Sequence, residues 1–237
     1  MKSRGIAFDS DVSVGTEPAA AVLEDRSRFK NNGTITNATW TRLPSGLWVL
    51  SFDGNDYLKN ATANWRSSDS AGAIEVWFKT SLANGQVLFA SDDEGTSTHG
   101  LVVYITNATG ELHVFQQNAD TGDDVKGTTN VCDGVWHHAV ISTNGVSATT
   151  EANHATDGYK IILDGVRETC SIATGANTGD WFAETTLRDN IVIGARNHTT
   201  IVSYMTGEIG YTIIYSSAIT VATALSNFNQ EKHLFGR

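Results

Sequence analysis

The feature that most constrains the fold of this chain is a pair of alternating segments, joined by a polar loop, within residues 133–165. The first segment reads DGVWHHAVIS and the second reads YKIILDG. Apolar side chains recur at every second position, so that Trp136 and Val140 share one face. Two segments with a two-residue period and a polar connection are typical of an antiparallel β-hairpin. The sequence therefore predicts a central hairpin in which Thr143 pairs with Tyr159.

Short strand-like segments, some alternating and some continuously apolar, occur along the rest of the chain. They lie at residues 6–8, 47–52, 73–79, 87–90, 101–105, 112–116, 191–194 and 208–215. In the last of them, Ile209 and Tyr211 are predicted to share one side with Tyr215. A helical period is indicated only at residues 221–227. This pattern predicts an all-β fold with less than about 10 % helix, built as a sandwich or jelly roll of antiparallel sheets.

We expect a single domain, residues 1–237, because no linker, repeat or low-complexity segment interrupts the pattern. Residues 1–5 are predicted to form a short arm and residues 229–237 a short tail. Six apolar side chains are predicted to be buried between the two sheets. They are Val76, Phe78, Trp136, Val140, Ile161 and Leu163.

The charge of the chain bears on its partners. It has 26 acidic and 16 basic residues and a formal net charge of −10 at pH 7. Phosphate binding needs a basic surface, so this composition disfavours nucleic acid as a partner. No apolar run approaches the ~18 residues of a membrane-spanning helix, and no secretory signal is seen at the start. We therefore expect neither nucleic-acid binding nor membrane insertion.

The two cysteines, Cys132 and Cys170, flank the central hairpin. If the pairing of Thr143 with Tyr159 is extended outward, they lie opposite each other, within the Cα separation of ~4.4–6.8 Å that a disulfide needs. A bond there would contribute about 4 kcal/mol to stability in the chain-entropy account. The alternative is two reduced, half-buried thiols, as in a cytosolic protein.

Several motifs together resemble one known family. In chain order they are DRSRFKNNGTI, LWVLSFDGNDYL, AIEVWFK, DGVWHHAVIS, YKIILDGV, IVIGARN and GEIGYTIIYSSAIT. Their order and character are similar to those of the laminin G-like (LamG) modules of the concanavalin A-like lectin/glucanase superfamily, over about residues 6–228. The resemblance implies a concanavalin A-like jelly-roll β-sandwich with one concave and one convex antiparallel sheet.

The chain departs from the family pattern in its last strand. Relatives usually carry an aspartate and a glutamate where this chain has Gly210 and Tyr211. The resemblance links an acid near that position to a structural calcium ion, so a calcium site on the last strand is in doubt. Acidic loops are the better candidates, because calcium (Ca2+) takes six to eight oxygen ligands that loops supply. The candidate ligands are Asp92, Asp93, Asp120, Asp123 and Asp124. The alternative is that these loops are solvated turns.

Catalytic residues are not indicated. A retaining glycosidase needs two carboxylates ~5–5.5 Å apart, whereas Glu75 and Glu208 each stand alone on their strands and are expected to be solvated. His137 and His138 are adjacent in a strand and point to opposite faces, so they cannot share a metal ion. We expect His138 to be a hydrogen-bonded core residue and the protein not to be an enzyme.

Sugar binding needs exposed aromatic side chains beside polar groups. Trp65, Trp181 and Tyr204 are the candidate glycan contacts, and Tyr104 and Phe115 are further candidates. The alternative for each is packing at the edge of the core.

These features favour a non-catalytic, surface-displayed structural or binding module. We expect a virion surface protein, a head decoration or tail component that contacts other structural subunits or cell-surface glycans; a homo-oligomer is left open. The alternatives are a glycan-binding lectin or adhesion module of an extracellular, secreted protein and, more remotely, a polysaccharide hydrolase or lyase. Residues 2–4 and 232–237 are the expected attachment points, and removal of residues 1–5 and 232–237 is predicted to leave folding intact but to weaken assembly.

Overall fold

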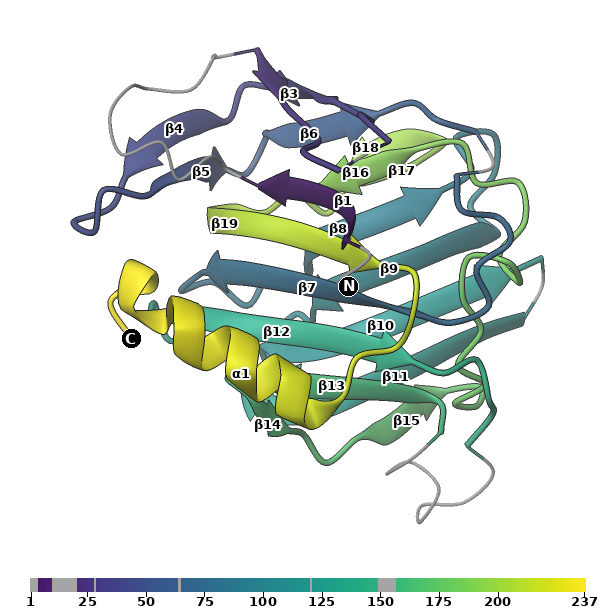
Figure 1. Ribbon diagram of the computed structural model, residues 1–237. Helices are drawn as coiled ribbons and strands as arrows, with labels where there is room; N and C mark the ends of the chain where they lie inside the picture. The colour runs from purple at the N-terminus through teal and green to yellow at the C-terminus, as the bar shows by residue number, and fades with distance from the viewer. Residues whose placement is uncertain (1–3, 10–20, 28, 64, 120, 149–156) are drawn as a thin grey trace.

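The protein folds as a sandwich of two antiparallel sheets (Figure 1). This computed structural model describes residues 4–9, 21–27, 29–63, 65–119, 121–148 and 157–237. Strands contain 47% of the residues and helices 7%, which confirms the predicted all-β fold.

The eight-stranded sheet contains the central hairpin. Its order is β14 (Val166–Arg167), β13 (Tyr159–Leu163), β12 (Trp136–Thr143), β7 (Gly72–Lys79), β19 (Thr206–Tyr215), β5 (Trp48–Asp53) and β4 (Thr39–Arg42), and β1 (Arg4–Asp9) also pairs with β19.

The nine-stranded sheet lies behind it in Figure 1. Its order is β15 (Ser171–Thr174), β11 (Thr121–Asn130), β10 (Glu111–Asn118), β9 (His99–Ile105), β8 (Gln86–Asp92), β16 (Ile191–Ile193), β6 (Tyr57–Asn60), β3 (Gly33–Thr36) and β2 (Val22–Leu23). A separate hairpin, β17 (Arg196–His198) and β18 (Thr200–Val202), adjoins β8.

The central hairpin has the predicted register, because Thr143 pairs with Tyr159. The pairing stops at Leu163, where the chain turns back at Asp164 and Gly165 into β14. Both turn residues have positive φ, 51° and 79°, as the Asp-Gly dipeptide of a tight two-residue hairpin turn requires.

This turn explains why the predicted disulfide is absent. Cys132 and Cys170 are free thiols in the structure. Extending the register outward assumed that the second strand continues past Leu163, but the chain reverses there. The two sulfur atoms instead donate to different carbonyls, that of Leu82 for Cys132 and that of Glu168 for Cys170.

Two helical segments cover the outer face of the eight-stranded sheet (Figure 1). Helix α1 (Val221–Glu231) begins after Thr220, whose hydroxyl accepts a hydrogen bond from the Thr223 amide as an N-cap. The 3-10 helix η2 (Lys232–Phe235) follows and inserts Phe235, which is 5% exposed. Residues 229–237, which were predicted to form a short tail, complete α1 and form η2 against the sheet.

Trp136 and Val140 are buried, but not between the sheets as predicted. They belong to the cluster beneath α1 and η2, with Trp77, whereas Phe78 and Ile161 lie between the sheets. Alternation along β12 was correctly assigned, but its two faces are both apolar. The sequence pattern alone could not show that a C-terminal helix covers the outer one.

A β-bulge in β19 changes which side chains share a face. Ile209 pairs with Phe78 but Thr212 pairs with Val76, so the strand holds one extra residue opposite Trp77. Ile209 consequently points between the sheets and Tyr211 points outward. The prediction that both share one side is wrong, because a bulge shifts the phase of alternation.

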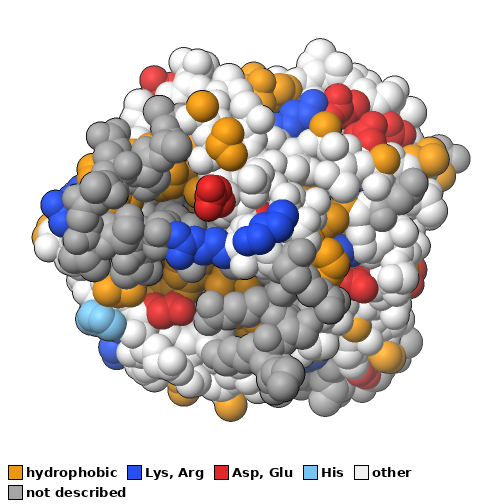
Figure 2. All heavy atoms as spheres, turned by 45° about the horizontal axis from the view of Figure 1, so that its top comes forward, with side chains coloured by type: hydrophobic (Ala, Val, Ile, Leu, Met, Phe, Trp, Pro, Cys, Tyr) orange, Lys and Arg blue, Asp and Glu red, His pale blue; other side chains and the backbone are white. Residues whose placement is uncertain are grey.

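The surface is mixed in character. On the face drawn in Figure 2, the described hydrophobic side chains occur in small groups among polar and charged ones. Such scattered exposure is normal for a folded domain. Within the described ranges, no helix has the length and apolar character needed to cross a membrane.

Candidate functional site

A pocket opens on the outer face of the nine-stranded sheet, with a cavity of about 310 Å³. Its lining residues are Gly85, Val87, Val102, Tyr104, Phe115, Asp124, Arg196 and Ser203. The volume is at the lower end of the range for small-molecule sites, roughly 300–1,000 Å³. It suits a small ligand or the terminal unit of a larger one.

Alternation along β9, β10 and β11 turns the floor residues outward. Val103, Val114 and Val125 point between the sheets, so their neighbours in the strands point to the opposite face. Cross-strand pairing then aligns Phe115 with Asp124. The result is a floor of aromatic and apolar side chains with a carboxylate at one side.

Tyr104, His113 and Asp124 form a hydrogen-bonded group at the floor. The Tyr104 hydroxyl donates to Asp124 Oδ2 over 2.7 Å, and His113 Nδ1 lies 2.8 Å from Asp124 Oδ1. Burial, together with the hydrogen bond to Asp124, raises the pKa of Tyr104 above its ordinary value. The phenol therefore stays protonated at neutral pH and serves as a donor, not as a nucleophile.

Arg196, on the β17–β18 hairpin, forms a wall of the pocket. Its Nε donates to Asp92 Oδ1 over 2.9 Å, and its guanidinium carbon lies 5.5 Å from the centre of the Phe115 ring. Gly100 pairs with Asp92 across β8 and β9. A Cβ at Gly100 would lie only 2.0 Å from Asp92 Oδ1, so the arrangement requires a residue without a side chain there.

The structure corrects two of the three candidate glycan contacts. Trp65 and Trp181 are 6% and 0% exposed and belong to the core between the sheets, because the loops that carry them fold inward. Tyr204 is half-buried, with its ring 6.5 Å from that of Tyr57, and it does not line the pocket. The further candidates Tyr104 and Phe115 do line it.

Sequence reasoning missed Arg196. It lies in the motif IVIGARN, which was used only to recognise the family. A cationic residue directly after a short apolar strand was the available signal, but nothing in the sequence pairs it with Asp92.

The predicted calcium ligands have other partners. Asp92 is fully buried and paired with Arg196, and Asp93 accepts a hydrogen bond from the Gly95 amide. Asp123 and Asp124 lie in strand β11, not in a loop as predicted.

Their partners differ accordingly. Asp123 accepts from Thr178 and the amide of Ala176, whereas Asp124 belongs to the pocket. Asp120 lies outside the described residues. Calcium binding by these aspartates stays a prediction.

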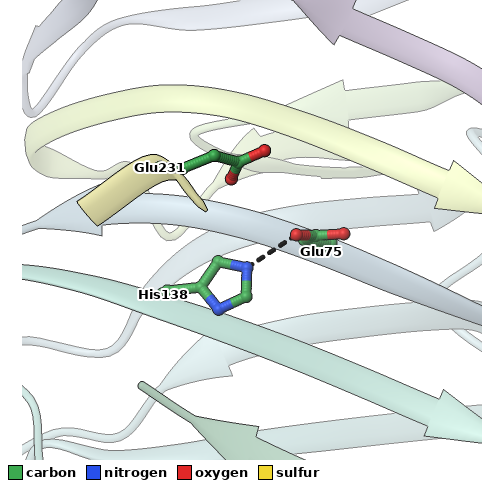
Figure 3. Close-up of side chains that lie close together, drawn as sticks. All are labelled: Glu75, His138 and Glu231. Atoms are coloured by element: carbon green, nitrogen blue, oxygen red, sulfur yellow. Dashed lines mark hydrogen bonds and ion pairs between the residues drawn. The ribbon is translucent and has the colours of Figure 1, made fainter. Parts of the chain in front are cut away.

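Glu75, His138 and Glu231 form a second polar cluster, beneath α1 (Figure 3). It is the one group of three within the described residues whose donor atoms are close enough to hold a metal ion, within 4.8 Å of one another. Glu75 and His138 are 0% exposed, with His138 Nε2 2.7 Å from Glu75 Oε1. The expectation that Glu75 is solvated is wrong, because α1 covers it; His138 is the predicted hydrogen-bonded core residue.

The two carboxylates of this cluster already accept hydrogen bonds from neighbouring side chains. Glu75 also accepts from Tyr215 and Asn227, while Glu231 accepts from Trp77 and Tyr211. Burial alone would raise the pKa of Glu75, but His138 and these donors lower it below the ordinary value. Since these bonds join side chains of the sheet to Asn227 and Glu231 of the helix, we interpret the cluster as a clamp that fastens α1.

The other predicted strand carboxylate, Glu208, is partly buried and forms an ion pair with Lys79. Neither it nor Glu75 lines the pocket. The only carboxylate among the pocket-lining residues is Asp124, and both of its oxygens accept hydrogen bonds.

Comparison with known protein families identifies the superfamily of the chain. The model of a laminin G family, described as the concanavalin A-like lectin/glucanases superfamily, matches residues 52–224. The chain belongs to this superfamily. A search of curated protein sequences finds no match to it.

Solved structures share the fold at low sequence identity. The IT-sialidase CBM40 of Ruminococcus gnavus bound to alpha2,3 sialyllactose has a TM-score of 0.58 and 14% identity, covering 80% of this chain and 98% of that one. Botulinum neurotoxin type C, whose cell entry depends on two ganglioside molecules, has a TM-score of 0.64 and 11% identity; the match covers 96% of this chain and 51% of that one.

A leech intramolecular trans-sialidase has a TM-score of 0.57 and 16% identity. The match covers 88% of this chain but 28% of that enzyme. At such identities these likenesses show the fold alone, and that fold is a lectin-like one.

Proposed function

We propose that this superfamily member is a non-catalytic glycan-binding module whose ligand site is the pocket between Tyr104, Phe115 and Arg196. The observation that carries the proposal is the juxtaposition of an aromatic floor with hydrogen-bonding groups, Arg196 and Asp124, in one cavity. Sugar rings have apolar faces that lie on aromatic rings and hydroxyls that need polar partners. Pockets for small ligands combine these two features.

Structural relatives support this choice. The Ruminococcus gnavus module was solved with sialyllactose, and the botulinum neurotoxin interacts with gangliosides. Sialyllactose and gangliosides both contain sugars, so two proteins that share this fold interact with glycan-containing molecules.

The chemistry of the pocket favours binding over hydrolysis. Glycosidic cleavage requires two carboxylates at a fixed separation, whereas one carboxylate lines this pocket, and Tyr104 is held protonated. Asp92 lies behind Arg196 and is fully buried. Release of reducing sugar from a polysaccharide panel, at rates well above background, would contradict the non-catalytic assignment.

A glycan array tests the binding proposal. The wild-type chain is expected to bind a subset of glycans. Phe115→Ala is expected to weaken that binding by about 10-fold or more, because packing a sugar face on one aromatic ring contributes on the order of 1–2 kcal/mol. Val166→Ala is the matched control, since Val166 is 66% exposed on the other sheet. Wild-type chain that binds no glycan, or equal loss in both variants, would contradict the proposal.

We propose surface display as the setting, on a virus particle or outside a cell, where such a module meets glycans and neighbouring structural subunits. Immunogold labelling of particles carrying a tagged chain tests it. Label on the particle surface supports the virion setting, and label confined to secreted material supports the lectin or adhesion alternative.

A further inference from the structure

Arg188, which is buried, and Arg196, which is half-buried, differ in how their donors are used. Arg188 is 2% exposed and donates to four oxygens, those of Thr185, Ser91, Trp65 and Phe182. Arg196 makes one hydrogen bond, from Nε to Asp92. Its Nη2 is buried and has no partner among the described residues. Arg188 thus uses four of its five N–H donors, whereas Arg196 uses one at the wall of the pocket.

A buried, unused donor on a half-buried guanidinium points to a missing acceptor. A guanidinium carries five N–H groups, and a buried polar group without a partner is unfavourable. The planar edge of arginine matches the two oxygens of a carboxylate better than it matches a single hydroxyl. Arg196 is also fixed in place, since Asp92 holds its Nε on one side and the Phe115 ring lies against the other.

Asp92 balances the positive charge of Arg196 only in part. Asp92 uses Oδ1 for Arg196, while its Oδ2 is buried without a partner among the described residues. Burial raises the pKa of Asp92 to about 7, against the opposing effect of Arg196, and Asp189 adds to the rise. Near neutral pH, Asp92 is therefore only partly ionised and only partly balances Arg196.

The other titratable groups of the pocket are engaged with one another. Asp124 accepts from Tyr104 and lies in an ion pair with His113, and it approaches the floor from β11. It is thus a partner for His113 and a hydroxyl acceptor for a ligand. Arg196 is the cationic group of the pocket lining.

We propose that the pocket recognises an acidic sugar, whose carboxylate binds Arg196 while the ring lies on Tyr104 and Phe115. This inference rests on the proposed glycan-binding function and adds the chemical class of the ligand. Hexuronic acids and sialic acids both supply the required group, a carboxylate attached to a sugar ring.

The test compares sugars that differ in the carboxylate. Isothermal titration uses 3′-sialyllactose against lactose, and tri-galacturonate against its methyl ester. The acidic member of at least one pair is expected to bind about 10-fold to 100-fold more tightly, as for a hydrogen bond to a charged group. The pair that shows the difference identifies the source of the carboxylate.

Variants assign the preference to Arg196. Arg196→Gln is expected to reduce the acidic preference at least 10-fold, and Arg196→Lys to restore it in part by keeping the charge without the planar edge. Because Arg196→Gln leaves Asp92 unpaired in the interior, the double variant with Asp92→Asn is measured too. Arg42→Gln is the matched control, since Arg42 is exposed on β4 of the other sheet.

The outcomes distinguish the acidic-sugar inference from the glycan-binding function. Equal affinity for acidic and neutral members, lost in Phe115→Ala, would overturn the acidic-sugar inference and keep the glycan-binding function. A preference that persists in Arg196→Gln and in the double variant would also overturn it. Binding of no member of either pair, and of no glycan on the array, would overturn both.

A pH series supplies an independent readout. An anion beside Asp92 favours its protonated form, so affinity for the acidic sugar should rise as pH falls from about 8 to about 6, around the pKa of Asp92. Asp92→Asn should flatten this response. A response that survives unchanged in Asp92→Asn would contradict the role given to Asp92.

Discussion

Phe235 is predicted to be one of the largest single contributors to the stability of the eight-stranded sheet's outer layer. Its ring is stacked on Trp77 with centroids 4.1 Å apart and lies 4.9 Å from the ring of Trp136. A Cβ at Gly210 would lie 2.5 Å from the same ring, so the absence of a side chain at Gly210 leaves room for it. The side chain thus closes a layer that five strands and two helical segments share.

Phe235→Ala should lower the free energy of unfolding by about 3–5 kcal/mol, the usual cost of removing a buried phenylalanine side chain. For a domain of this size, each kcal/mol corresponds to about 2–4 °C, so the melting temperature should fall by roughly 6–20 °C. Urea unfolding followed by tryptophan fluorescence measures the change. Asn229→Ala, at an exposed position of α1, is the control and should change stability by less than about 0.5 kcal/mol.

A loss below about 1 kcal/mol in Phe235→Ala would refute the reasoning. The same packing overturns the expectation that residues 232–237 can be removed without effect on folding. Their removal takes away Phe235 and also the ion pair between Arg237 and Asp164, so the shortened chain should be at least as unstable as the point variant.

Three further predictions concern the same structure. The pKa of Glu75 is lowered in the folded state, so its contribution to stability is present above about pH 4.5 and is lost on acidification below it. When stability is measured over a pH series, Glu75→Gln should remove part of the loss at acidic pH. The same loss in the variant as in the wild type would contradict the clamp. Because Cys132 and Cys170 are free thiols, the melting temperature should be the same with and without a reductant, whereas a fall with reductant would reveal a disulfide. If Asp92 and Asp93 bind calcium, the melting temperature should be higher in calcium than in a chelator, and equal values would eliminate that prediction.

Local patterns in the sequence predicted the strands and the central register well. Thr143 pairs with Tyr159 because alternation and a polar loop suffice to define a hairpin. The sequence did not predict the second turn at Gly165, although Asp-Gly is a strong hairpin signal. Reading that dipeptide as a turn would have prevented the disulfide prediction.

Assignments that depend on the third dimension were less successful. The outer face of β12 carries Trp136 and Val140, which are as apolar as a core face, because α1 and η2 cover it. The same cover makes Glu75 a buried clamp residue and not a solvated one. Trp65 and Trp181 sit in loops, which favoured exposure, but these loops fold between the sheets.

The binding site shows the same division. Tyr104 and Phe115 were candidates because sugar binding needs exposed aromatic side chains beside polar groups. Arg196 and Asp92 come from strands far apart in sequence, and only the fold brings them together. A pocket that joins four strands and a hairpin has no contiguous signature in one sequence.

The most direct test of the account is a crystal structure of the protein with the tightest-binding sugar from the two matched pairs. The account predicts electron density for a sugar ring against Tyr104 and Phe115, with a carboxylate on the guanidinium of Arg196. Density for the sugar at another surface, with the Tyr104–Phe115–Arg196 pocket holding only solvent, would contradict it.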